Sequence, residues 1–136
     1  MANQWIIPCN LSFFDIISHF EENDEMLWKA TSATAEGDIV YLYVCRPYSR
    51  IMYRCHVVAT NIDNHEIEAS PYAHILTPSK NRRNYIRIKK DYPIADDRLS
   101  FDELKLHGLA SVQSQMQLSP DLINHIGKII SNLGGE

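Results

Sequence analysis

The distribution of apolar and polar positions along the chain predicts a strand-rich domain. Residues 39–45 are apolar throughout and rich in β-branched and aromatic types, which indicates a strand buried on both faces. Residues 51–59 alternate instead, and the segment 46–50 lies between the two. The alternation assigns four side chains to one buried face: Ile51, Tyr53, Cys55 and Val57. The pattern therefore predicts an antiparallel hairpin with its turn at residues 46–50.

Shorter strands are expected on both sides of this hairpin. Residues 5–7 and 26–29 are suited to two of them, and Pro8 is expected to end the first. Residues 85–90 alternate and predict another strand. The segment 60–83 is polar and broken by prolines, so we expect a long excursion with little regular structure.

Helices are predicted where a capping residue precedes an apolar stripe. Ser12 and Asp15 have the spacing of a capping box. Ser100 and Glu103 repeat that spacing before a short helix that is expected to stop at Gly108. The stripe of the first helix is formed by Phe13, Ile16, Ile17 and Phe20.

A further helix is predicted near the end of the chain. Ser119 is suited to its N-cap and Pro120 to its first helical position. Its apolar stripe is formed by Leu122, Ile123, Ile126, Ile129 and Ile130. Strands and helices together predict the α+β class, with a mixed or antiparallel sheet.

Size and composition fit one globular domain, residues 1–136, with 45% hydrophobic and 22% charged residues. No apolar run approaches the roughly 20 residues needed to span a bilayer, so no membrane is expected as a partner. The first residues lack the basic segment of a secretory signal. The three cysteines show no CxxC spacing and are interpreted as reduced thiols. These features favour a cytoplasmic protein.

A net charge of −4 conceals a basic segment. Residues 79–90 contain no acid and six cations, namely Lys80, Arg82, Arg83, Arg87, Lys89 and Lys90. The rest of the chain is correspondingly more acidic. A cationic patch on an acidic body is typical of a surface that meets an anion.

Motifs for catalysis or metal binding are absent from the sequence. The six histidines form no HxH, HExxH or Cys/His grouping, and neither a phosphate-binding glycine loop nor a GxSxG elbow is present. Asp96 and Asp97, followed by Glu103 and Lys105, imitate the carboxylates and lysine of metal-dependent nucleases. The capping box with Ser100 already explains Glu103. We therefore expect no metal, no cofactor and no enzymatic activity.

Three segments form a recognisable combination: the tryptophan segment 28–31, the Gly37-Asp38 pair with the apolar strand after it, and the segment 46–57 with its proline-containing turn. Together they resemble the EVE family of the PUA-like superfamily.

The two ends of the chain carry the same resemblance. Residues 5–10 and 14–16 look like the start of the family, although Leu11-Ser12 stands where Pro-Lys is usual. Residues 99–104 and 108–109 resemble a C-terminal part of EVE-like domains attached to restriction endonucleases.

The resemblance implies a small twisted β-barrel flanked by helices, with a pocket that accepts one modified nucleobase. YTH domains and some restriction-enzyme targeting domains are similar in stacking a flipped base on aromatic rings. A flipped base needs a π surface and fixed polar groups for its Watson–Crick edge, and its flanking phosphates need cations.

Aromatic side chains are the candidates for the walls of this base pocket. Trp28 is the first candidate, and Trp5, Tyr43 and Tyr48 are further ones. Packing in the core is the competing role of each ring. Tyr41 and Tyr53 are assigned to packing of the barrel.

Polar candidates complete the pocket and its surroundings. Asn10 is suited to reading a base edge because its amide both donates and accepts, and capping of the following helix is its competing role. Lys29, Thr31 and Ser32 follow Trp28 and are expected to line the same opening. Phosphate contacts are assigned to Arg46, Arg50, Lys80, Arg82 and Arg83.

The sequence thus leads to a main hypothesis and two alternatives. The main hypothesis is a nucleic-acid-binding module that recognises a modified base, such as a methylated one, in a restriction or defence system. Its expected partners are nucleic acid, modified DNA rather than RNA, and a nuclease domain or subunit. One alternative is a protein–protein adaptor or regulatory domain on the same barrel, with the acidic surface as its docking face. The other is a nuclease that uses Asp97, Glu103 and Lys105.

Overall fold

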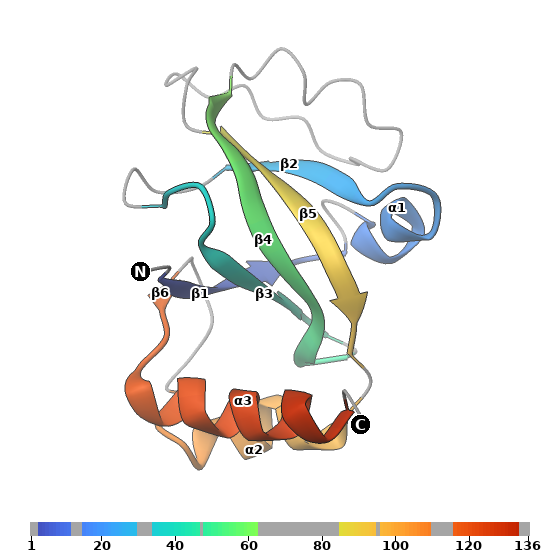
Figure 1. Ribbon diagram of the computed structural model, residues 1–136. Helices are drawn as coiled ribbons and strands as arrows, with labels where there is room; N and C mark the ends of the chain where they lie inside the picture. Colours follow the sequence, from blue (N-terminus) through green and yellow to red (C-terminus); the bar gives the residue numbers. More distant parts are fainter. Residues whose placement is uncertain are drawn as a thin grey trace.

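The computed structural model of this chain describes residues 3–11, 15–29, 34–46, 48–62, 85–94, 96–109 and 116–133. The described strands are β1 (Gln4–Cys9), β2 (Glu25–Lys29), β3 (Ile39–Val44), β4 (Arg50–Ile62), β5 (Tyr85–Pro93) and β6 (Met116–Gln117). The described helices are α1 (Ile16–Glu22), the 3-10 turn η2 (Asp97–Leu99), α2 (Phe101–Lys105) and α3 (Pro120–Leu133). The predicted α+β class is confirmed (Figure 1).

One mixed sheet contains all the described strands, in the order β2-β5-β4-β3-β1-β6. The pair β1–β3 is parallel and the other neighbouring pairs are antiparallel. Strands β4 and β5 run steeply across β1 and β3, so the sheet is strongly twisted (Figure 1). Within the described residues β2 and β6 remain edges, and the expected barrel is wrong in this respect. A closed barrel would require the edge strands β2 and β6 to pair with each other. In the described residues, β6 pairs with β1.

The predicted hairpin is confirmed. Strands β3 and β4 pair in antiparallel fashion, with Val40 opposite Cys55 and Leu42 opposite Tyr53. β4 is longer than predicted and continues to Ile62. The prediction stopped short because the apolar alternation fades after Val57, although the backbone stays paired with β5.

A β-bulge changes the face on which Ile51 lies. The register shifts between Leu42 and Tyr43, and Tyr43 pairs with Ile51, so Met52 is an extra residue in β4. Partners in an antiparallel pair point to the same side of the sheet. Ile51 therefore lies on the face of Tyr43, opposite to Tyr53. Simple alternation had placed Ile51 and Tyr53 on one face.

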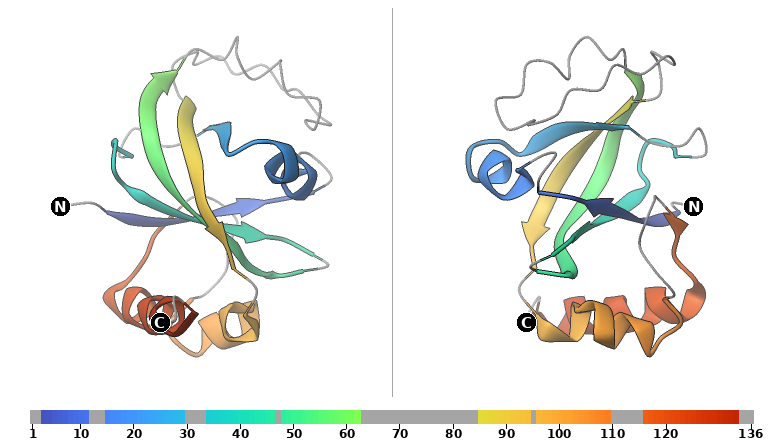
Figure 2. Two further views of the ribbon diagram at one scale, coloured as in Figure 1. Left: turned by 45° about the vertical axis from the view of Figure 1, so that its right-hand side comes forward. Right: turned by 180° about the vertical axis from the view of Figure 1, so that it is seen from behind.

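Two clusters of buried side chains lie on opposite faces of the sheet. The first, called the inner core, contains Trp5, Ile7, Cys9, Ile16, Phe20, Met26, Val40, Leu42, Val44, Tyr53, Cys55, Val57, Ile86 and Ile88. The second, called the helical core, contains Ile6, Tyr41, Tyr43, Ile51, Ile94, Leu99, Leu104, Leu109, Leu118, Leu122, Ile126 and Ile129. Helix α1 packs on the inner core, while α2 and α3 lie together against the helical core (Figure 2).

Strand β3 connects these two cores. Val40, Leu42 and Val44 enter the inner core, and Tyr41 and Tyr43 enter the helical core. All five are buried, which confirms the prediction of a strand covered on both faces.

Pro8 does not end the first strand, because β1 continues to Cys9. Backbone groups of Asn3 and Cys9 face β3, since their carbonyl oxygens accept from Ile39 and Cys45. The backbone groups of the even-numbered residues of β1 point away from β3. The carbonyl oxygen of Gln4, for example, accepts from the backbone N–H of Leu118. The missing N–H of Pro8 therefore points to a side that the short β6 does not reach, and no ladder bond is lost.

Helix starts follow the expected capping chemistry with one difference. Ser100 accepts from the backbone of Glu103 and Ser119 accepts from that of Leu122, as predicted. Asp15, however, is itself the N-cap of α1 and accepts from the backbone N–H of Ser18 at 3.2 Å. A capping box led by Ser12 would have given Asp15 a position inside the helix. None of the described helices is long and apolar enough to cross a bilayer.

The cysteines are free thiols in this structure. Cys9 and Cys55 are buried, and Cys45 is half-buried just beyond β3. Burial, with smaller contributions from Cys45 and Asp15, raises the pKa of Cys9 to about 12. The thiol of Cys9 is thus protonated and unreactive at neutral pH.

A buried carboxylate connects the start of the sheet. The side chain of Asp38 accepts from the indole N–H of Trp5 at 2.9 Å, from the backbone N–H of Ala35 at 3.0 Å and from that of Asn3 at 3.1 Å. Its backbone oxygen accepts from Val57 in β4 at 2.9 Å. Burial alone would raise the pKa of Asp38, but these side-chain hydrogen bonds outweigh burial and lower it.

Replacing this carboxylate should destabilise the protein. We expect Asp38→Asn to lower the free energy of unfolding by about 1–3 kcal/mol, because a buried acceptor is exchanged for an amide N–H₂ that faces other donors. Urea unfolding at pH 7 measures the loss. Glu36→Gln is the matched control, since Glu36 is exposed in the same turn.

The stability difference between wild type and Asp38→Asn should also depend on pH. The pKa of Asp38 is lower in the folded chain than in the unfolded chain, so its contribution is complete above the unfolded value of about 3.9 and is lost as the pH falls through the folded value. The stability difference between wild type and Asp38→Asn should therefore narrow below about pH 4. A constant difference down to pH 2 would contradict this role.

Candidate nucleic-acid interface

Trp28 lies on the edge strand β2. It is opposite Ile86 of β5, and its half-buried ring packs against the inner core. A half-buried tryptophan on an edge strand is the kind of side chain on which a base can stack.

Three cations of the basic segment lie on β5 beside this edge. Arg87 is within 3.7 Å of Glu25, and Lys90 donates to the carbonyl oxygen of Phe20 at 2.8 Å, at the end of α1. Lys89 is exposed, and within the described part of the chain its ammonium has no ion-pair partner. Lys89 is thus the most accessible of the three. It pairs with Glu25, three residues before Trp28, so its side chain leaves the sheet on the opposite face from the Trp28 ring.

The turn between β3 and β4 holds a second group of the predicted residues. Tyr48 is 41% exposed and Arg46 is exposed, whereas Tyr43 is buried in the helical core. The Tyr43 ring contacts Phe101 edge-on at 6.5 Å. Arg50 is bound to Asp97 at 2.6 Å, so part of its charge is neutralised.

These two groups do not form one pocket. Trp28 is aligned with Ile86, and the next residue of β5, Arg87, pairs with Ala59 of β4. Ala59 is about nine residues, or roughly 30 Å of strand, from Arg50. Figure 1 accordingly shows β2 near the end of β4 that lies away from the turn. The structure therefore separates Trp28 from Tyr43 and Tyr48.

Trp5 and Asn10 have different surroundings from those of Trp28. The Trp5 ring is only 6% exposed, and its N–H is bound to Asp38, so this side chain has a structural role. Asn10 is exposed beyond the end of β1. It is not the cap of α1, because Asp15 occupies that position.

Five predicted site residues lie outside the described residues: Thr31, Ser32, Lys80, Arg82 and Arg83. Lys29 is the last residue of β2 and directly follows Trp28. The predictions for these positions stay predictions.

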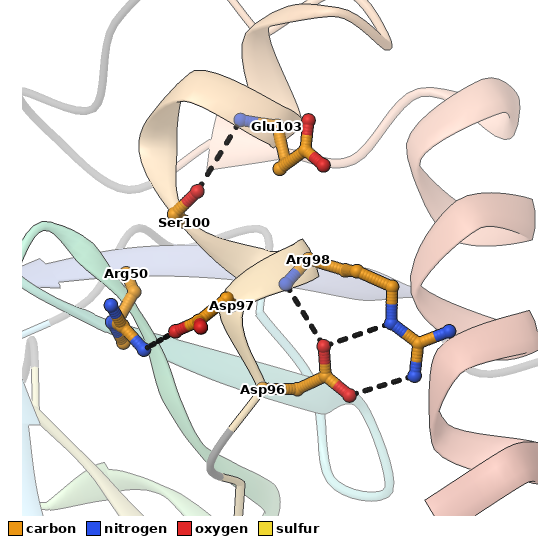
Figure 3. Close-up of polar contacts among 6 residues, drawn as sticks. All are labelled: Arg50, Asp96, Asp97, Arg98, Ser100 and Glu103. Atoms are coloured by element: carbon orange, nitrogen blue, oxygen red, sulfur yellow. Dashed lines mark hydrogen bonds and ion pairs between the residues drawn. The ribbon is translucent and has the colours of Figure 1, made fainter.

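The carboxylates that imitate a nuclease site have other partners (Figure 3). Asp97 binds Arg50, and Asp96 accepts from the Arg98 guanidinium at 2.8 and 2.9 Å. The Arg98 hydrogen bonds lower the pKa of Asp96 to about 2. The carboxylate of Glu103 points away from Asp97 in Figure 3. Within the described residues, no three His, Cys, Asp or Glu side chains are grouped to hold a metal ion.

Sequence reasoning missed a row of polar side chains on the helical face. Tyr41 was assigned to packing, and Arg54 and Tyr92 received no role. The register of β3, β4 and β5 aligns the three side by side. No local pattern could reveal this, because the pairing of β4 with β5 bridges the long segment between them.

Solved structures share this fold over almost the whole chain. A hypothetical protein from Leishmania major has a TM-score of 0.65 at 15% identity, covering 98% of both chains. An ASCH structure from Zymomonas mobilis has a TM-score of 0.64 at 12% identity, covering 93% of this chain and 95% of that one. Human THYN1 in complex with 5-methylcytosine-containing DNA has a TM-score of 0.61 at 11% identity, covering 99% of both chains.

No model of a known protein family and no curated protein sequence matches the chain. Identities of 11–16% establish a likeness of fold alone.

The interpretation of Glu103 as part of a helix start can be tested directly. Ser100→Ala should lower the free energy of unfolding by about 1 kcal/mol, because it removes the acceptor at the N-cap of α2. Glu103→Gln, the control, should change it little. Magnesium should not shift the unfolding midpoint of the wild type, whereas a metal site at Asp97 and Glu103 would raise it.

Proposed function

We propose that this protein is a nucleic-acid-binding module that reads a modified nucleobase at the β2 edge, with Trp28 as the stacking surface. The observation that carries the proposal is the likeness of the whole fold to a structure that holds 5-methylcytosine-containing DNA. The residue-level resemblance to the EVE family supports the same function. Membership of that family is part of the proposal.

The position of Trp28 supports this function. Base stacking needs a ring whose one face is held by the protein while the other stays accessible. We assign this role to Trp28 because it packs against the inner core and is half-buried. Trp5 is not suited to it, because its ring is enclosed and its N–H is bound to Asp38.

The charges beside the β2 edge support a polyanionic partner. Lys89 lies on β5 next to β2, on the opposite face from Trp28, and three further cations of the segment 79–90 precede that strand in the sequence: Lys80, Arg82 and Arg83. Cations near a base pocket would neutralise the phosphates that flank the flipped base. In this proposal the module acts in the cytoplasm without catalysis of its own, beside a nuclease domain or subunit of a restriction or defence system.

Loss of the Trp28 ring should weaken recognition of the modified base. Base–aromatic stacking contributes roughly 1–3 kcal/mol per base, so Trp28→Ala should reduce affinity for a 5-methylcytosine oligonucleotide by about tenfold to a hundredfold. Trp28→Phe keeps an aromatic face and should retain much of the affinity. Fluorescence anisotropy with methylated and unmethylated strands measures both variants.

Tyr48→Ala is the matched control, because it removes an exposed aromatic ring at the far end of β4. It should bind like the wild type. Circular dichroism verifies folding. A folded Trp28→Ala variant with wild-type affinity would refute the stacking role, and a wild type that binds no strand at all would favour the adaptor function.

Charge removal in the basic segment should act differently from loss of the ring. We expect the double variant Arg82→Ala with Arg83→Ala to lower the affinity for methylated and unmethylated strands alike. The slope of log affinity against log salt should fall by about one unit per lost phosphate contact. Titrations at several salt concentrations test this. A selective loss for the methylated strand would assign these arginines to base reading instead.

A further inference from the structure

A row of three side chains crosses the helical face of the sheet, away from Trp28. The register pairs Tyr41 of β3 with Arg54 of β4, and Arg54 with Tyr92 of β5. The Arg54 guanidinium lies near enough to Tyr41 to act against the burial that raises the pKa of this phenol, and its central carbon lies 5.8 Å from the centre of the Tyr92 ring. The row thus presents a cation between two phenols.

Arg54 is held in this position by Asp91. The carboxylate of Asp91 accepts from the Arg54 guanidinium through one oxygen. Its other oxygen lies 2.6 Å from Nδ1 of His56. Two such contacts fix Asp91, and Asp91 fixes Arg54. A cation that is already oriented loses little conformational entropy when a ligand binds.

Helix α3 provides the opposite wall of a groove. Leu122, Ile126 and Ile129 point into the helical core, so a different stripe of the helix faces the row. That stripe is formed by Asn124, Gly127, Lys128 and Ser131, at the spacing i, i+3, i+4 and i+7. The groove between helix and sheet has a volume of about 770 Å³. Figure 2 shows α3 extending along the sheet on this side.

Gly127 leaves the floor of this groove open. It lies in the interior of α3, where glycine is less favourable than alanine by roughly 1 kcal/mol. A Cβ added there would meet no atom within 4 Å, so packing does not require the glycine. Its backbone dihedrals do not require it either, because φ is positive only at Gly37, Gly108 and Ser49 among the described residues. Gly127 therefore leaves open space on the α3 side of the groove.

The groove has a positive lining on an acidic protein. Lys128 contributes the charge, because that of Arg54 is partly neutralised by Asp91, and none of the described residues that line the groove is acidic. Lys128 is exposed, and within the described ranges its ammonium has no ion-pair partner. This arrangement favours a ligand that carries an anionic group.

The remaining lining matches a planar ring. Tyr92 is 36% exposed, so part of its ring is accessible, and three isoleucines (39, 123 and 130) add apolar surface. Burial raises the pKa of both Tyr41 and Tyr92. Both phenols therefore stay protonated at neutral pH and can donate. Amides from Gln4 and Asn124 offer further donors and acceptors.

We propose that this groove is a binding site for a nucleotide unit. The base packs on Tyr92 beside the Arg54 guanidinium, and its phosphate is bound by Lys128. A volume of about 770 Å³ lies within the range of roughly 300–1,000 Å³ that is usual for small-ligand sites. The nucleotide is either free or part of a strand. This site goes beyond the proposed function, because it lies on the other face of the sheet from Trp28.

Isothermal titration calorimetry with cytidine and adenosine 5′-monophosphates tests the site, and a short unmodified single strand forms the second arm. Lys128→Ala should weaken binding of the phosphate-bearing ligands by about tenfold, because a charge-assisted contact is lost. Lys105→Ala is the matched control, since it removes the same charge from α2, outside the groove, and should change affinity less than about twofold. The nucleosides without phosphate should bind as weakly to the wild type as the monophosphates bind to Lys128→Ala.

Gly127→Ala separates binding from folding. The substitution should raise the thermal unfolding midpoint, because alanine is the better helix former, and yet reduce nucleotide affinity because its methyl group occupies the floor. If the monophosphates bind, the ligand of the groove is a free nucleotide. If only the single strand binds, with the same dependence on Lys128, the ligand is a strand. If neither ligand binds at millimolar concentration, the proposal is wrong.

Trp28→Ala distinguishes this groove from the proposed base-reading site. It should leave monophosphate binding unchanged. If Trp28→Ala abolishes that binding while Gly127→Ala and Lys128→Ala bind like the wild type, the nucleotide lies at the β2 edge and the groove is not its site. If Trp28→Ala loses recognition of the methylated strand and nothing else, the result bears on the proposed function and not on the groove.

Discussion

The carboxylate of Asp38 fixes the relative positions of three strands, and the rest of the fold depends on it. Its side chain binds Asn3 and Trp5 at the start of β1, and its own backbone pairs with Val57 of β4. Parallel strands have no tight turn to set their register, so β1 needs such a side-chain anchor to align with β3. Once β3 is aligned, its alternate residues supply both cores, and the two helical layers acquire surfaces to cover.

Local patterns predicted most elements of this fold, with β6 and η2 as exceptions, but not their assembly. The apolar run of β3 and the alternation of β4 identify the hairpin, because burial leaves a direct trace in residue type. The bulge at Met52 leaves no such trace in the sequence. An extra residue changes the face on which Ile51 lies without changing the hydrophobicity of Ile51. The expected barrel failed for a related reason. Whether a sheet closes depends on how its last strands meet, and the two residues of β6 carry too little pattern to reveal that.

The candidate sites show the same limit at the level of side chains. The aromatic character of Trp28 could be read from the sequence, whereas its separation from Tyr48 along β4 is a property of strand register. Arg54 and Tyr92 look like ordinary surface residues of an alternating strand until pairing places them side by side. In α3 one signal was available: a glycine in the middle of an amphipathic helix, three residues after Asn124 and four before Ser131. Tertiary contacts alone could show that it faces a groove.

The position of β1 between β3 and β6 also governs the order in which this chain can fold during synthesis. β1 leaves the ribosome before both of its neighbours: its parallel partner is completed only with Val44, and its other neighbour only with Gln117. The side chain of Gln117 reaches back to Asn3 across 114 residues. Contacts so distant in sequence are slow to form, because closing a long loop costs entropy before any contact compensates it. A nascent chain that ends before residue 116 therefore carries an apolar strand with one unpaired edge, which is the kind of surface that chaperones protect.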